Sequence, residues 1–214
     1  DYYGMIVNSS TPFFDGKNYK RVIIGKDIRQ IGSCFLNCSL LASIDVDAFN
    51  PDYTSIDGVL YNKDITTLIR CPEGKEKVTI PHSVTEIGTE AFHGCSSLIE
   101  IRIPHSVTRI GLRTFYGCSS LEEIVIPNSV SRIGWSAFEN CTSLSFVKIP
   151  RNADVQTNSF PLSTTIIRVD EEDGFPHDTV GGKQSNQSYS LNTDGVLSIS
   201  GFAEICDTIE FDKD

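Results

Sequence analysis

The chain of 214 residues is short of positive charge and contains no long hydrophobic run. Lysine and arginine number 18 against 28 acidic residues, so the formal net charge is −10. An acidic protein of this kind lacks the basic footprint that binds nucleic acid or an anionic membrane. No apolar stretch approaches the roughly 20 residues that a membrane-spanning helix requires. We therefore expect no nucleic-acid partner and no membrane span in this chain.

The sequence signatures of common enzymes are also missing. There is no G-x-S-x-G motif of a nucleophilic serine, no G-x-G-x-x-G dinucleotide motif and no G-x-x-x-x-G-K-[ST] phosphate loop. The acidic run 170–173 lacks the D-x-D-x-D-G spacing of a calcium loop. These absences predict a protein that is not an enzyme and that has no cofactor and no metal ion.

A repeat of 23 residues occupies the middle of the chain. Proline, phenylalanine, cysteine and leucine each return at this interval, as Pro81, Pro104 and Pro127, Phe92, Phe115 and Phe138, Cys95, Cys118 and Cys141, and Leu98, Leu121 and Leu144. A fixed period in this range is typical of stacked repeats, in which each unit buries its apolar side against its neighbours. Equivalent side chains are then expected to stack about 4.8 Å apart, the distance between neighbouring strands.

Within one unit, alternating apolar residues predict a strand that includes Ile101 and Ile103. Pro104 fits the end of this strand because it has no N–H to give to a ladder. The segment from Thr114 to Cys118 is expected to form a short helical turn. The predicted fold class is an α/β repeat solenoid, a leucine-rich ribbon with one strand and one short helical or 3-10 turn in each 23-residue unit, plus inserted β-hairpins. We expect about five such units in the chain.

The interruptions of the repeat predict three regions. Residues 1–20 form an irregular capping segment, and residues 21–170 form the solenoid with a hairpin insert at about 47–77. In that insert we expect one strand from Ile56 to Tyr61 and another from Ile65 to Arg70. Residues 171–214 comprise an acidic loop, a polar linker and a hairpin whose strands lie at 189–191 and 196–199. A strand at 208–211 would lead into further repeats.

Cysteine is used seven times, so at least one thiol must be unpaired. No C-x-x-C pair occurs, and Cys34 and Cys38 are not followed by histidines at zinc-finger spacing. A disulfide framework and a metal site are the alternatives, but three of the cysteines share one phase of the repeat. We therefore expect buried, reduced thiols that act as small hydrophobic residues.

The run IPHSVTEIGTEAFHGCSSL, residues 80–98, resembles the BspA-like leucine-rich-repeat family of bacterial surface proteins, whose repeat reads roughly I-P-x-S-V-x-x-I-G-x-x-A-F-x-x-C-x-x-L. The segment 55–64 resembles a hairpin that recurs in the same family. The resemblance implies a bacterial protein that is secreted or held at the cell surface. It also implies adhesion, or binding of other proteins or host matrix, and it offers no catalytic residues.

The strand face of such a solenoid is its expected binding surface. The positions predicted to point outward form a strip that we call the strand strip: Lys77, Thr79, Glu100, Arg102, Glu123, Val125, Phe146 and Lys148. Apolar groups surrounded by charge often mark an interface, although scattered apolar residues on an ordinary surface need no explanation. The prediction is that this strip binds a protein.

A second candidate is a ridge at the position that follows Ile-Gly, where Leu112 and Trp135 recur. An aromatic residue on a ridge can bind a sugar or a partner, or can simply pack on its neighbour. The alternative function is accordingly a structural spacer, or an accessory part of a larger surface protein that contacts carbohydrate.

Overall fold

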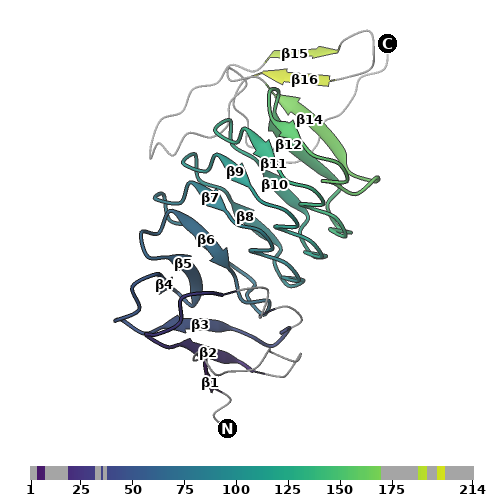
Figure 1. Ribbon diagram of the computed structural model, residues 1–214. Helices are drawn as coiled ribbons and strands as arrows, with labels where there is room; N and C mark the ends of the chain where they lie inside the picture. The colour runs from purple at the N-terminus through teal and green to yellow at the C-terminus, as the bar shows by residue number, and fades with distance from the viewer. Residues whose placement is uncertain are drawn as a thin grey trace. The chain divides into compact units, whose positions relative to one another are not determined.

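The computed structural model describes residues 4–7, 19–31, 35, 38–169, 188–191 and 197–200. The chain divides into two compact units, 1–168 and 169–214. In these described ranges the regular structure consists of strands, and no helix is long and apolar enough to cross a membrane. Figure 1 shows the strands of the first unit stacked one after another along the chain.

The first unit begins with a parallel sheet of three strands, β1 (Gly4–Val7), β2 (Arg21–Ile24) and β3 (Ser43–Val46). Val22 pairs with Ile44 and both are buried, so the alternating apolar residues of the two strands meet in one core. The sequence did not predict a strand at β1, which pairs in parallel with β2.

An antiparallel meander follows, built from β4 (Tyr53–Ile56), β5 (Val59–Asn62) and β6 (Thr67–Arg70). The expected strand from Ile56 to Tyr61 is wrong in detail, because Asp57 and Gly58 form a turn between β4 and β5. Both residues have positive φ, 48° and 73°, which is the requirement of a two-residue hairpin turn and the reason that Asp-Gly favours it. The insert therefore has three strands.

Each later coil of the solenoid contributes a strand to each of two sheets (Figure 1). One sheet has four strands, β8 (Glu100–Arg102), β10 (Glu123–Val125), β12 (Phe146–Pro150) and β14 (Thr165–Val169). The other continues the meander through β7 (Glu86–Ile87), β9 (Arg109–Ile110), β11 (Arg132–Ile133) and β13 (Asp154–Val155). A regular unit thus has two strands where the sequence predicted one.

The predicted helical or 3-10 turn is not confirmed, because the described coils have hydrogen-bonded turns at that position. The N–H of Phe92 donates to the carbonyl of Thr114 in the next coil at 2.7 Å, whereas the N–H of His93 donates within its own turn to Glu90 at 3.1 Å. Alternate N–H groups are therefore used between coils. A helix would need all of them for bonds within one segment, and the ladder between coils excludes it.

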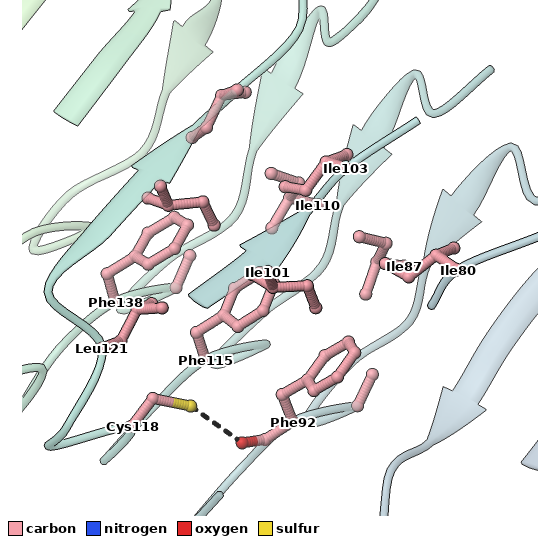
Figure 2. Close-up of a cluster of buried hydrophobic side chains, with 14 of the residues drawn as sticks. Ile80, Ile87, Phe92, Ile101, Ile103, Ile110, Phe115, Cys118, Leu121 and Phe138 are labelled. Atoms are coloured by element: carbon pink, nitrogen blue, oxygen red, sulfur yellow. Dashed lines mark hydrogen bonds between the residues drawn. The ribbon is translucent and has the colours of Figure 1, made fainter. Parts of the chain in front are cut away.

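The core of the regular coils contains a column of aromatic rings beside aliphatic side chains (Figure 2). Phe92, Phe115, Phe138 and Phe160 stack with 4.9 Å between successive ring centroids, close to the expected strand spacing. The first three rings are fully buried. The predicted stack of equivalent apolar side chains is therefore confirmed for this column.

The cysteines of the described residues are buried thiols: Cys38, Cys71, Cys95, Cys118 and Cys141. The thiol of Cys118 donates to the carbonyl of Phe92 at 3.2 Å, and the thiol of Cys141 donates to that of Phe115 at 3.1 Å. A hydrogen bond with Cys141 and burial together raise the pKa of the Cys118 thiol. The prediction of buried thiols is confirmed for these five residues.

A column of glycines lets the coils approach each other closely. A Cβ on Gly134 would lie 2.4 Å from the carbonyl oxygen of Gly111, and one on Gly111 would lie 2.7 Å from the carbonyl carbon of Gly88. No side chain fits such distances without movement of the backbone. Packing between coils therefore requires glycine at Gly111 and Gly134.

The second unit contains an antiparallel hairpin of β15 (Ser188–Leu191) and β16 (Leu197–Ser200). This pairing confirms the hairpin that the sequence predicted near 189–199. The predicted strand at 208–211 and most of the predicted acidic loop and linker lie outside the described residues.

Candidate binding surfaces

Register aligns the residues of the strand strip in two rows across the four-stranded sheet. The first row pairs Glu100 with Glu123 and Glu123 with Phe146. The second row pairs Arg102 with Val125 and Val125 with Lys148. Thr79 extends the second row through an isolated parallel bridge to Arg102, and Lys77 is exposed in the segment before it.

The alternation of burial along β8, β10 and β12 shows which side chains face outward. Ile101, Ile124 and Val147 are buried, and the strip residues on either side of each are exposed or half-buried. Val125 and Phe146, which we expected to be exposed, are half-buried instead. They occupy diagonal positions on neighbouring strands, within reach of each other for an aromatic side chain.

Charges surround this apolar pair. Val125 lies between Arg102 and Lys148 in its row, and Glu123 lies beside Phe146. Glu100 and Glu123 are direct neighbours of like charge, an arrangement that costs a little stability unless a cation compensates it. The strip therefore offers a small apolar centre with cations on one row and carboxylates on the other.

The ridge residues Leu112 and Trp135 are 44% and 57% exposed, respectively. The indole Nε1–H of Trp135 donates to Oε1 of Gln156 in the next coil at 2.6 Å. The Nε2–H group of Gln156 donates in turn to Oδ2 of Asp154 at 2.7 Å, and Nε of Arg132 lies 4.0 Å from the same carboxylate oxygen. The exposed indole is therefore held by a chain of side chains from two coils.

The junction between the meander and the regular coils contains a buried ion pair that the sequence did not reveal. Arg70 and Glu73 have side chains that are only 7% and 4% exposed, and Nη2 of Arg70 lies 3.0 Å from Oε1 of Glu73. The same nitrogen donates to the carbonyls of Phe35 at 2.9 Å and His93 at 3.2 Å. No local motif marks this pair, because Phe35 and His93 come from distant coils.

His93 lies next to this ion pair and is half-buried. Burial and the nearby Arg70 guanidinium lower the pKa of its imidazole from the ordinary value of 6.5. Its ring stacks on Tyr116 in the next coil with 4.9 Å between the centroids. These contacts favour the neutral imidazole and give His93 a packing role.

Two sheets that share coils of 23 residues, an apolar column and a glycine column define the class of protein: it is a leucine-rich-repeat solenoid. The family model of the BspA type leucine rich repeat region matches residues 6–74 and 70–170 with six copies. The chain belongs to this family. The match finds one copy more than the sequence analysis expected.

Solved bacterial structures support the assignment. A leucine-rich repeat protein from Eubacterium ventriosum is 27% identical with a TM-score of 0.60, over 72% of this chain and 49% of that one. A leucine rich cell surface protein from Faecalibacterium prausnitzii is 27% identical with a TM-score of 0.55, over 74% of this chain and 49% of that one. A leucine-rich repeat protein from Bacteroides ovatus is 28% identical with a TM-score of 0.52, over 78% of this chain and 42% of that one. The chain spans about half the length of the first two. No curated protein matches the sequence.

Proposed function

We propose that this chain is a binding module without enzymatic activity, which recognises a protein partner through the strand strip. The observation that carries the proposal is the alignment of Val125 and Phe146 between charged neighbours on one continuous sheet face. Protein interfaces commonly combine an apolar centre with a polar rim. The stacked coils place these groups on consecutive strands, so a partner can contact several coils at once.

The proposal also includes a place of action, at the outer surface of a bacterium. Leucine-rich repeats generally serve as scaffolds for interactions, and the similar protein from Faecalibacterium prausnitzii is described as a cell surface protein. Surface biotinylation of intact cells that express the whole protein tests this point. Labelling only after the cells are broken would contradict it.

The strand strip is tested by a pull-down from host matrix proteins with quantitative mass spectrometry. We expect Phe146→Asp combined with Arg102→Glu to abolish the capture of partners, because it removes the apolar centre and reverses a flanking charge. A matched control is Leu162→Asp combined with Arg151→Glu, which makes the same changes at exposed positions outside the strip. If the strip variant captures every partner as the unaltered chain does, the proposed surface is wrong.

A further inference from the structure

We propose that the ridge carries a second, independent site, at which a pyranose ring of a neutral glycan stacks on Trp135 and binds to Asp154 and Arg132. The site uses the seven-stranded sheet and the turn after β11, and none of its residues belongs to the strand strip. It therefore does not depend on the proposed protein interface.

The first argument is that the indole is both exposed and fixed. A side chain that is 57% exposed gains little from burial, yet Trp135 is tied through Nε1–H to Gln156 and through Gln156 to Asp154. A ligand that stacks on a ring already held in place does not have to order it, so less conformational entropy is lost on binding. The network thus prepares a flat apolar platform.

The second argument concerns the chemistry beside the platform. The face of an aromatic ring carries negative charge density, and the C–H groups on the flat side of a pyranose present a complementary positive edge. A carboxylate only accepts hydrogen bonds and a guanidinium only donates them. Both Gln156 and Arg132 approach Oδ2 of Asp154, so neither contact uses Oδ1. Two adjacent sugar hydroxyls can donate to that oxygen and accept from the Arg132 guanidinium, which is half exposed.

The surroundings favour a sugar over a protein on this ridge. The residues equivalent to Trp135 in the flanking coils are Leu112 on one side and Thr157 on the other, and Thr89 lies beyond Leu112; both threonines are exposed. A protein hot spot normally lies within a wide desolvated patch, and the centre of a protein interface is depleted of charge. Here a single aromatic ring donates to the amide of Gln156, which in turn contacts the carboxylate of Asp154, and this polar setting suits hydroxyl groups.

Trp135 is the only tryptophan in the chain, so its fluorescence reports on this site alone. The probes are three soluble neutral polysaccharides, a β-glucan, a mannan and a galactan, with hyaluronan as an anionic comparison. We expect at least one neutral polymer to change the emission of Trp135 and to protect it from quenching by acrylamide. Calorimetry of the same titration gives an affinity that can be compared between variants.

Two variants and one control separate binding from folding. We expect Trp135→Ala and Gln156→Leu each to weaken glycan binding by about tenfold or more. The control Leu112→Ala removes the equivalent side chain one coil away and should change the affinity by less than about twofold. Circular dichroism establishes that each variant is folded, and the Phe146→Asp, Arg102→Glu strip variant should retain glycan binding.

Three results would overturn the inference. They are the absence of binding to all three neutral polymers, glycan binding that survives Trp135→Ala, and a protein partner that requires Trp135 while no glycan does. Selective binding of hyaluronan is one form of the first result, because the predicted ligand is neutral. Loss of protein capture by the strip variant with intact glycan binding would leave both proposals standing.

Discussion

The regular coils from β7 onward and the preceding region from β2 to β6 are held together in different ways. In the regular coils the same residue type recurs at the same phase, and Phe92, Phe115 and Phe138 stack at a constant 4.9 Å. The glycine column and the thiol contacts repeat with them. Each coil therefore packs against a neighbour that has the same residue types at these positions.

The earlier region combines its own apolar core with individual buried polar side chains. The side-chain amide of Asn50 donates to the carbonyls of Gly25 at 2.9 Å and Ile28 at 3.0 Å and accepts from the N–H groups of Asp52 and Tyr53. At the start of the regular coils, Arg70 likewise pairs with Glu73 and donates to the backbone carbonyl of Phe35. Where the meander replaces a regular coil, backbone groups lose their equivalent neighbours, and side chains must supply the missing hydrogen bonds.

Truncation of the aromatic column should have the largest effect. We expect Phe115→Ala to lower the free energy of unfolding by about 3–5 kcal/mol, since it removes a fully buried ring and leaves a cavity between two others. Urea denaturation followed by far-UV circular dichroism measures the change. Phe160→Ala is the matched control, because this ring is half-buried and lies at the end of the described stack. Equal losses for the two variants would contradict a column in which inner coils share their burial.

At the junction, replacing one member of the ion pair should lower the free energy of unfolding more than replacing both. Arg70→Met leaves the Glu73 carboxylate buried without its partner, and we expect this to cost about 3 kcal/mol. Arg70→Met combined with Glu73→Met replaces both charges with apolar groups and should recover most of the loss. Thermal and urea unfolding of the three proteins make the comparison. A double variant as unstable as the single one would show that the hydrogen bonds to Phe35 and His93 matter more than the charge pair.

The smallest predicted effect is the dependence of stability on pH through His93. Because burial lowers the pKa of this imidazole in the folded state, its stabilising contribution is complete above pH 6.5 and is lost as the pH falls through the lowered value. We expect the melting temperature to fall on acidification from about pH 7.5 to about pH 5. His93→Phe keeps a ring against Tyr116 and removes the titration, so its fall should be smaller. Identical profiles for the two proteins would exclude this role.

Much of the regular array could be predicted from the sequence, because an apolar residue that recurs at one position of each coil is buried against its equivalents in the neighbouring coils. Phe115 is buried by Phe92 and Phe138, which have the same identity at the same phase, so the period alone predicts the column. The spacing of Ile124 and Ile126 likewise predicted which side of β10 faces outward. The Asp57-Gly58 turn also has a local signal in the sequence, although the apolar residues around it predict one continuous strand.

The turns and the polar contacts could not be predicted in this way. The segment near Thr114 has the composition of a helical turn, and it becomes a different turn only because its carbonyls accept bonds from the previous coil. Phe35 and His93 meet Arg70 across 35 and 23 residues of sequence. No local pattern indicates such partners.

The amino-acid sequence by itself determined that the chain stacks in coils of 23 residues, and which side chains fill the column, because burial of apolar groups requires only a repeated position. The tertiary structure alone decided the conformation of the turns, the partners of the buried ion pair and the orientation of the Trp135 ring. Each of these depends on a directional hydrogen bond to another part of the chain. Such bonds require particular atoms within about 3 Å, and only the stacked coils bring those atoms together.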